Sequence, residues 1–395
     1  MVCGIQKRVI FALEMRSEEI DFLLSDSGRE VVRQNRGRDP HRVALDEKVP
    51  YRAAVATQIK YLERARRKLP SYVEAEAVLL PRAFEQASSE EAASAKGISG
   101  DSLLDLTCGL GVDTLHLSRH FRRVVSLERD PLLARVTREN LRRMGVEHVE
   151  VLCASAEEYL ATCTEHFDWI YADPDRRNDE GRKQVCLEDC SPDILRLQPL
   201  LERVGDRLCL KNSPLFDVEE AFRLFPKSRV RVLSIGDECK EILILTGEEH
   251  PRLEVEALHR GALSVERSAV EHHSMGPFEP ERYRWLVIPD VALQKARLVN
   301  HHLGVRCYVA SENGYAFSVE YPEGVVGRVE EIERIEPYNP RQLKRELKGV
   351  GVELLKRDFP LSVEEVRRRC ALKQGAERRI ALTKIEGHSW TIWLK

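Results

Sequence analysis

A short apolar segment followed by a glycine-containing turn is the clearest chemical feature of this sequence. The segment reads LLDLTCGLGVD at 103–113, with Asp105 before the turn and Gly109 and Gly111 within it. Glycines allow a backbone to approach a ligand closely, and the helix expected next offers free N–H groups. A pyrophosphate site would have a third glycine where this chain has Thr114, whereas Asp105 suits an ammonium group. The turn therefore predicts a ligand that carries an amine.

A carboxylate at the end of the next apolar segment extends this prediction. Glu128 ends the segment VVSLE, 17 residues after Gly111. A carboxylate at this place in a nucleotide-binding fold can hold two ribose hydroxyls. A tight strand–helix turn without any ligand is the alternative, but the ordered combination of Asp105, the two glycines and Glu128 favours a nucleoside ligand.

Charged residues follow a later apolar segment directly. FDWIYAD at 167–173 leads into the sequence DPDRR, which contains Asp175, Arg176 and Arg177. Guanidinium groups bind phosphate through paired hydrogen bonds, so the two arginines are candidates for substrate binding. The alternative is that they pair with neighbouring acids at the surface.

Seven apolar segments alternate with amphipathic ones in the middle of the chain. Such alternation is typical of parallel strands joined by crossover helices, with ligands over the carboxyl ends of the strands. The last two segments are joined by the Gly-containing IGDECK and predict an antiparallel hairpin. The predicted fold is α/β with a Rossmann-like sheet, whose strands lie at 103–106, 124–128, 149–153, 167–173, 207–211, 230–234 and 241–246.

The remaining sequence is assigned to three further regions. Residues 1–95 have apolar residues at helical spacing, and residues 251–282 look like a connector because HHSMGPFEPE is rich in turn formers. Residues 283–395 predict an α+β region with a helix over 291–299, and residues 96–250 hold the Rossmann-like domain. A capping box of Ser362 and Glu365 opens a later helix.

Composition and charge indicate a soluble, cytoplasmic protein that contacts a polyanion. Hydrophobic residues make up 43 % of the chain, no segment resembles a signal peptide or a bilayer span, and the 10 cysteines are scattered without a zinc framework. No metal site is expected. Residues 341–395 hold fourteen Lys and Arg against seven Asp and Glu, although the net charge of the chain is -3. Smaller basic clusters at 33–42 and 60–68 add to this pattern.

Four motifs together resemble a known family. The turn DLTCGLG with Glu128 resembles the first two motifs of class I S-adenosylmethionine-dependent methyltransferases. EQASSEEAASAKG (85–97), YADPDRRN (171–178) and LKNSPLFDV (210–218) resemble a bacterial group of these enzymes with a C-terminal THUMP-like, ferredoxin-like domain. The usual THUMP enzymes carry this domain at the N-terminus, so the domain order differs here. The resemblance implies S-adenosylmethionine as the cofactor and RNA as the substrate.

The resemblance also implies roles for individual residues around the cofactor. Asp105, Gly109 and Gly111 would hold its methionine part, and Glu128 its ribose. The end of the third strand usually supplies an acid to the adenine amine, whereas this chain has CASAE with Ser155. The implied cofactor contacts are Asp105, Thr107, Gly109, Gly111, Asp113, Glu128, Ser155 and Asp173.

On the substrate side, DPDRR resembles the Asp-Pro-Pro-aromatic motif of amino methyltransferases, with Asp175 and Arg176 at the last two places. A second similarity is the order Lys96, Asp173, Lys211 and Glu241, which looks like the Lys-Asp-Lys-Glu set of ribose methyltransferases. A central lysine there lowers the pKa of a ribose hydroxyl; the alternative is an ordinary ion pair of Lys211 with Glu241. The expected catalytic residues are Asp173, Pro174, Asp175 and Lys211, and the expected substrate-binding residues are Arg176, Arg177 and Lys96.

The predicted function is methylation of tRNA or rRNA at a base nitrogen or a ribose hydroxyl. One alternative is a small-molecule or protein methyltransferase whose other domains serve assembly. Another is a non-catalytic RNA-binding protein on the same fold, which the unusual Ser155 and Asp175 favour. The complete set of Asp105, Gly109, Gly111 and Glu128 speaks against that second alternative.

Overall fold

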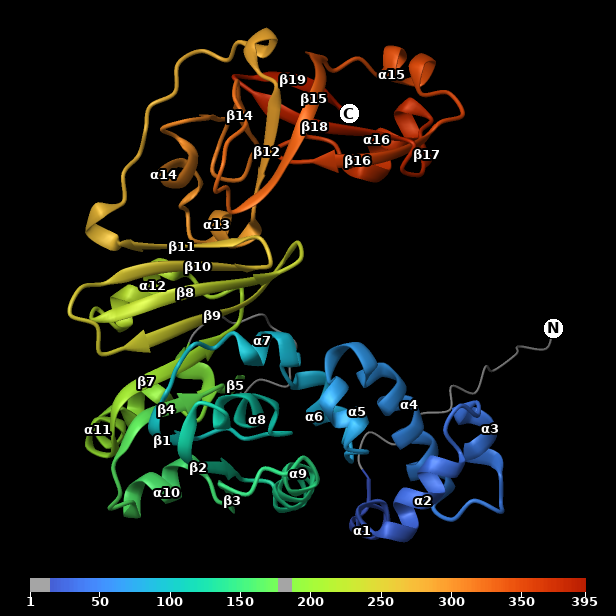
Figure 1. Cartoon of the computed structure of the whole chain (residues 1–395), viewed down its shortest axis with the longest axis vertical. Helices are drawn as coiled ribbons and strands as arrows, with labels where there is room; N and C mark the ends of the chain where they lie inside the picture. Colours follow the sequence, from blue (N-terminus) through green and yellow to red (C-terminus); the bar gives the residue numbers. More distant parts are fainter. Residues whose placement is uncertain (1–14, 177–186) are drawn as a thin grey trace, which may run out of the picture. The chain divides into compact units, whose positions relative to one another are not determined.

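The computed structural model describes residues 15–176 and 187–395, which are drawn in colour in Figure 1. These residues divide into two units with separate cores. The first unit extends to Asn212 and includes Leu245–Gly247, and the second consists of Ser213–Ile244 and Glu248–Lys395. Within the described ranges, no helix combines the length and the apolar character that a membrane crossing requires.

A parallel sheet is the centre of the first unit. Val124 and Val125 are both buried, and since consecutive residues of a strand point to opposite faces, both faces of the sheet are covered. The strand order is β7-β4-β1-β2-β3, and each neighbouring pair is parallel. The predicted α/β, Rossmann-like fold is therefore confirmed, with strands β1 (Gly100–Asp105), β2 (Phe121–Glu128), β3 (Val149–Cys153), β4 (Phe167–Ala172) and β7 (Gly205–Asn212).

The crossover helices start at the carboxyl edge of this sheet. Asp130 caps the helix after β2, since its Oδ1 accepts hydrogen bonds from the N–H groups of Leu132 (2.8 Å) and Leu133 (3.2 Å). Because the strands are parallel, the carboxyl ends of β1, β2 and β4 meet at this edge. The helices are α8 (Val112–Ser118), α9 (Pro131–Arg143), α10 (Ala156–Thr162) and α11 (Ile194–Val204), and a short strand pair follows β4, β5 (Asp175–Arg176) with β6 (Cys190–Ser191).

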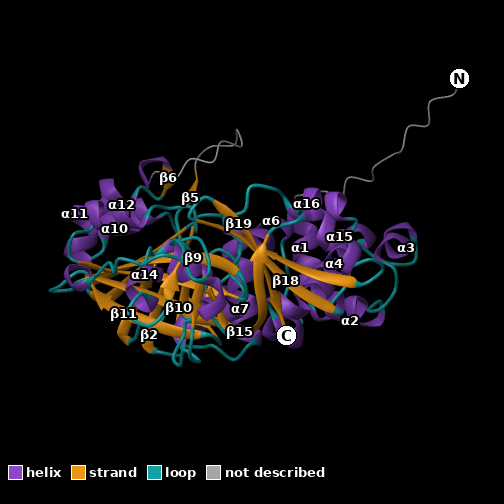
Figure 2. Cartoon of the chain, turned by 90° about the horizontal axis from the view of Figure 1, so that it is seen from above, coloured by secondary structure: helices purple, strands orange, loops and turns teal. Residues whose placement is uncertain are grey.

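The N-terminal region consists of helices between the first described residue and β1, as the sequence predicts (Figure 2). Ile59 and Leu62 of α4 are buried in a core that also contains Val136 and Leu141 of α9. The helices are α1 (Ser17–Leu24), α2 (Asp26–Gln34), α3 (Pro40–Leu45), α4 (Arg52–Lys68), α5 (Pro70–Glu74), α6 (Pro81–Gln86) and α7 (Glu90–Ser94).

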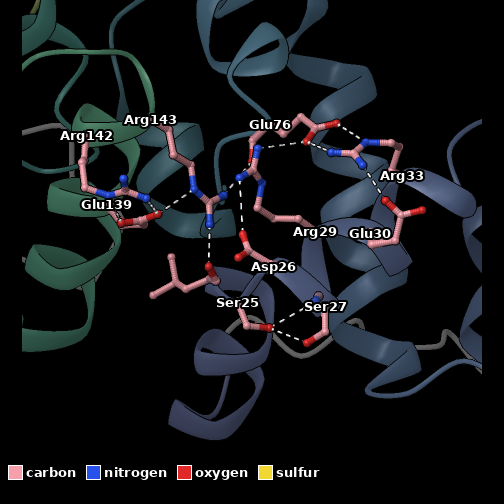
Figure 3. Close-up of polar contacts among 12 residues, drawn as sticks. Ser25, Asp26, Ser27, Arg29, Glu30, Arg33, Glu76, Glu139, Arg142 and Arg143 are labelled. Carbon is pink, nitrogen blue, oxygen red and sulfur yellow. Dashed lines mark hydrogen bonds and ion pairs between the residues drawn. The ribbon is translucent and has the colours of Figure 1, made fainter.

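An arginine–carboxylate network fastens these helices to α9 (Figure 3). Arg143 is buried and donates to the carbonyl oxygens of Leu24 (2.6 Å) and Glu76 (3.0 Å) and to the Glu139 carboxylate (2.9 Å). Arg33 of α2 donates to the Glu76 carboxylate. A single side chain of α9 therefore joins the end of α1 to the segment after α5.

The second unit begins with four strands, of which the sequence pattern predicts the first two. The tight turn at Gly236, with φ of 65°, joins β8 to β9 as predicted. Residues 251–282 were expected to be a connector, but the first half of this range forms two strands. The signal was the alternation of Leu253, Val255 and Ala257, which are buried while their neighbours are not. The strand order is β11-β10-β8-β9, with β8 (Ser228–Ile235), β9 (Glu238–Thr246), β10 (Arg252–Leu258) and β11 (Gly261–Glu266), and with helix α12 (Val218–Leu224).

A second sheet, of eight strands, fills the rest of this unit, and helices are interspersed with its strands as the predicted α+β fold requires. The helix expected over 291–299 is interrupted, because Arg297 adopts a left-handed φ of 56° between two short helices. The capping box of Ser362 and Glu365 is present. The strand order is β13-β14-β12-β15-β19-β18-β16-β17. The strands are β12 (Trp285–Pro289), β13 (Tyr308–Val309), β14 (Ala316–Ser318), β15 (Gly327–Pro337), β16 (Gly351–Lys356), β17 (Lys373–Gln374), β18 (Arg378–Ile385) and β19 (His388–Leu394), and the helices are α13 (Val291–Lys295), α14 (Val299–Leu303), α15 (Pro340–Glu346) and α16 (Val363–Cys370).

Candidate active site

A cavity of about 520 Å³ lies at the carboxyl edge of the parallel sheet, within the first unit. This volume lies in the range of sites for small organic ligands. The N-terminal region contributes an apolar wall with Met15 and with Ile20 of α1, which the sequence pattern did not indicate. Predicted residues that line the cavity are Thr107, Gly109, Asp113, Glu128, Ser155, Asp173 and Asp175.

The turn after β1 forms one side of this cavity. Gly109 adopts a φ of +56°, and a Cβ there would meet only open space, with Thr107 O at 4.0 Å as its nearest neighbour. A ligand can therefore approach the backbone at this point. Gly111 lies on the other side of the turn, where a Cβ would come within 2.7 Å of Thr137 Cγ2 on α9. It does not line the cavity, so its predicted contact with a ligand becomes close packing against α9.

Glu128 lies at the end of β2, where the sequence placed it. Its Oε2 accepts from Gly109 N (2.9 Å) and its Oε1 from Asp130 N (2.8 Å), so both oxygens are fixed in orientation. Burial raises the pKa of this carboxyl. Each oxygen retains acceptor capacity toward the cavity, which suits two neighbouring hydroxyl groups.

Asp105 does not line the cavity, although a direct contact with an amine was expected. Its buried carboxylate accepts hydrogen bonds from Thr114 Oγ1 (2.6 Å), Ser126 Oγ (2.7 Å) and Thr107 N (2.9 Å). Burial raises the pKa of Asp105 to about 6 despite these bonds. Asp105 therefore supports the turn from behind.

Lys96 is also not where substrate binding would need it. Its side chain is 1 % exposed, and Nζ lies 3.3 Å from Asp113 Oδ1. The hydroxyl groups of Tyr171 (2.8 Å) and Ser88 (2.9 Å) donate to the other oxygen of Asp113. Burial opposes the charge of Asp113, but Lys96 and Lys211 lower its pKa to about 2. Lys96 thus belongs to a buried polar cluster below the cavity.

Asp173 and Lys211 are brought together, as the order of charged residues predicted. Lys211 Nζ donates to Asp173 Oδ2, and Asp173 N donates to Thr107 Oγ1 (2.7 Å). Asp173 lines the cavity, and Lys211 lies behind it with a side chain 14 % exposed. Glu241, the fourth member of the predicted set, is buried in β9 of the second unit.

Asp175 lies at the rim of the cavity, separated from Asp173 by Pro174. Gln86 Nε2 on α6 lies 3.3 Å from its Oδ2. Partial desolvation and then the charge of Asp173 raise the pKa of the Asp175 carboxyl. Gln86 and the exposed Arg82 of α6 also line the cavity, and neither was predicted as a site residue. Gln86 belongs to the motif EQASSEEAASAKG that carries the family resemblance, whereas Arg82 lies before that motif.

The other predicted residues are placed only partly. Ser155 lines the cavity and caps α10, and its Oγ hydrogen-bonds Glu158. Arg176 lies in β5 by its backbone, whereas its side chain and Arg177 lie outside the described residues. Among the residues described, no group of three or more His, Cys, Asp or Glu is arranged to hold a metal ion.

Two domain families match parts of this chain. Residues 103–187 match the family "Methyltransferase domain", which covers the turn, Glu128 and the Asp173 segment. Residues 327–395 match the family "THUMP domain-like", which covers β15–β19.

Related proteins agree with this assignment over longer stretches. An uncharacterized S-adenosylmethionine-dependent methyltransferase of Mycobacterium tuberculosis is 26 % identical, over 77 % of this chain and 83 % of its own length. The crystal structure of a candidate methyltransferase from Porphyromonas gingivalis W83 is similar with a TM-score of 0.82 at 25 % identity, and covers 97 % of this chain and 99 % of its own. A tRNA/tmRNA (uracil-C(5))-methyltransferase of Acinetobacter baylyi is 30 % identical over 25 % of this chain and 34 % of its own.

The fold, the cavity and the similarity to known methyltransferases together show that this chain is a methyltransferase. More narrowly, the chain is a methyltransferase with a C-terminal THUMP-like domain, and the predicted resemblance is confirmed.

Proposed function

We propose that this protein transfers the methyl group of S-adenosylmethionine to RNA. The observation that carries the proposal is the cavity at the carboxyl edge of the sheet, where Gly109 leaves the backbone open and Glu128 presents two oriented oxygens. The Mycobacterium tuberculosis relative, which is named for the same cofactor, supports it.

The cavity fits the chemical parts of this cofactor. Glu128 would accept hydrogen bonds from the two ribose hydroxyls. Leu132, Leu133 and Ser155 would surround the adenine, and Thr107 with Gly109 would lie along the methionine part. When bound, the cofactor supplies a methyl group that its sulfonium has already activated. The protein then needs mainly to hold the acceptor in line with that group.

The acceptor that we propose is a nitrogen of an RNA base. The cavity is lined by the carboxylates of Asp173 and Asp175, which accept hydrogen bonds from N–H groups. Lys211, which would have to stabilise a ribose alkoxide, is neutralised by Asp173 and lies behind it. These contacts favour a base nitrogen over the ribose hydroxyl.

RNA as the substrate is supported by relatives and by charge. The Acinetobacter baylyi relative is named for tRNA and tmRNA, and a Coxiella burnetii relative, 38 % identical over 18 % of this chain, is ribosomal RNA small subunit methyltransferase J. In the THUMP-like region several arginines are engaged in ion pairs, such as Arg379 with Glu330. Exposed cations remain on and beside α15 and α16, namely Arg341, Lys344, Lys348, Arg368 and Arg369.

Calorimetric titration with S-adenosylmethionine tests the cofactor assignment. We expect binding by the wild type and a loss of at least about tenfold in affinity for Glu128→Ala, because hydrogen bonds to a charged group contribute about 1.5–3 kcal/mol. Glu157→Ala, which removes a second carboxylate on the cavity wall, is the matched control and keeps most of the affinity. A wild type that binds no cofactor, with or without RNA, would contradict the proposal.

A further inference from the structure

Cationic side chains form a stripe along the second half of α4. Lys60, Arg64, Arg67 and Lys68 recur at spacings of three and four residues, so they share one side of the helix. Arg64 and Arg67 are exposed, as is Arg82 on α6. These five residues are called the α4–α6 face below.

Aromatic rings hold part of this face in place. The Arg64 guanidinium lies 5.1 Å from the ring centre of Tyr61 and 5.5 Å from that of Phe84. Lys68 Nζ lies 4.8 Å from the ring centre of Phe84 and donates to its carbonyl oxygen at 2.6 Å. Such cation–π contacts orient the cations without neutralising them. The only acids on α4 and α6 are Glu63 and Glu85, and Glu85 pairs with Arg64.

The α4–α6 face is continuous with the rim of the cavity. Lys68 and Arg64 contact Phe84 and Glu85, which lie between Arg82 and Gln86 on α6. Arg82 and Gln86 themselves line the cavity, and Gln86 contacts Asp175. A polyanion on this face would therefore reach the cavity without leaving the first unit.

We propose that the α4–α6 face binds the RNA backbone next to the target nucleotide and leads that nucleotide, unpaired, into the cavity. The inference rests on the proposed function. A cavity of about 520 Å³ has the size of a small-ligand site and is too small for a base pair beside a cofactor. The target must therefore leave its stack, and the phosphates on either side of it then lie at the rim. A row of cations along one side of an exposed helix binds the phosphates of a single strand without regard to sequence.

The salt dependence of RNA binding tests the proposal on the full chain. The probe is a short, labelled, single-stranded RNA of mixed sequence, and its Kd is measured over a series of KCl concentrations. We compare the wild type with the double variant Arg67→Ala/Arg82→Ala, after thermal unfolding has shown that the variant is folded. The matched control is Arg122→Ala, because Arg122 is 82 % exposed but lies at the amino end of β2, opposite the cavity.

Loss of two phosphate contacts should reduce the slope of log Kd against log salt by about 1.4, since each contact to a single strand contributes about 0.7. The control and the double variant Arg67→Lys/Arg82→Lys, which keeps both charges, should retain the wild-type slope. An unchanged slope in the alanine variant would overturn the proposal and favour an acidic protein as the partner of this face. If the wild type methylates RNA in that case, the proposed function stands. A wild type that neither binds nor methylates RNA would overturn both.

Discussion

Lys211 donates a hydrogen bond to the carboxylate of Asp173, so a cation on β7 holds the residue with which β4 reaches the cavity. The parallel register, which pairs Ala172 with Leu210, brings the two residues together. One strand thus supplies a carboxylate that lines the cavity, and its neighbour supplies the charge that orients this carboxylate.

Replacing this lysine should impair activity more than stability. Lys211→Met removes the ion-pair partner of Asp173. Because Asp173 is half-exposed and water can solvate it, we expect the free energy of unfolding to fall by only about 1–2 kcal/mol. Because Asp173 is no longer oriented, kcat should fall by at least about tenfold, or about 1.4 kcal/mol. Urea unfolding and methyl-transfer kinetics measure the two effects, with Lys211→Arg as the control that keeps the charge. Wild-type kcat in Lys211→Met would show that the pair has no role in the reaction.

Alanine substitutions at two glycines with left-handed backbone distinguish the cost of backbone strain from the cost of a steric clash at Cβ. In Gly111→Ala, an alanine held at a φ of +81° should lower the free energy of unfolding by about 1 kcal/mol. Its Cβ would also lie 2.7 Å from Thr137 Cγ2, and this clash should lower the free energy of unfolding further, by about 1–3 kcal/mol. Gly145→Ala is the matched case, because φ is +73° and nothing lies within 4 Å of its Cβ. Urea unfolding should show a distinctly larger loss for Gly111→Ala. Equal losses would mean that the turn does not pack tightly against α9.

The buried carboxyl of Asp105 should make stability depend on pH. Its pKa is raised from 3.8 to about 6, so the native state binds the proton more tightly than the unfolded chain. The stabilising contribution of Asp105 to the free energy of unfolding is therefore fully present below about pH 4. It is lost as the pH rises through about 6. The loss amounts to roughly 3 kcal/mol from a shift of about two pH units.

Comparison with Asp105→Asn isolates this contribution. The difference in unfolding free energy between wild type and variant should change by that amount between about pH 3 and pH 7, with the wild type losing stability as the pH rises. If the two curves run parallel over this range, Asp105 has an ordinary pKa and a more polar environment than its burial indicates.

The network around Arg143 predicts a link between the N-terminal helices and the cofactor. Arg143→Met removes a buried cation that joins α1, the segment after α5 and α9, which should cost about 3 kcal/mol. Cofactor affinity should also fall, because Met15 and Ile20 then no longer close the cavity. Arg142→Met is the matched control: it contacts the same Glu139 but is 69 % exposed, so its loss should cost less than about 1 kcal/mol. Similar losses in both variants would contradict the role assigned to Arg143.

The backbone of the site was predictable because its signals are local. Glycines at 109 and 111 and a carboxylate at the end of the next strand follow from strand and turn patterns, and the parallel register then brings Glu128 to the turn. The order of Asp173 and Lys211 in the sequence was likewise enough to predict that they meet, since both lie at the carboxyl ends of neighbouring parallel strands.

Side-chain orientation was not predictable in the same way. Asp105 precedes the turn, but hydroxyl groups of Thr114 and Ser126 turn its carboxylate away from the cavity. Lys96 is buried and pairs with Asp113, which lies on a helix that begins sixteen residues later, so no local pattern marks this contact. Arg82 and Gln86 reach the cavity through the packing of α6, and no periodicity marks such a contact.

Transfer of a labelled methyl group from S-adenosylmethionine to RNA tests the central claim most directly. Bulk tRNA and small-subunit ribosomal RNA are incubated with the full chain, and the label is counted in RNA, in protein and in small molecules. Label should appear in RNA with the wild type and fall by at least about a hundredfold, or about 2.7 kcal/mol, with Asp173→Ala. Label confined to protein or small molecules, or equal label in RNA from the Asp173→Ala variant, would contradict the assignment of this cavity as an RNA methylation site.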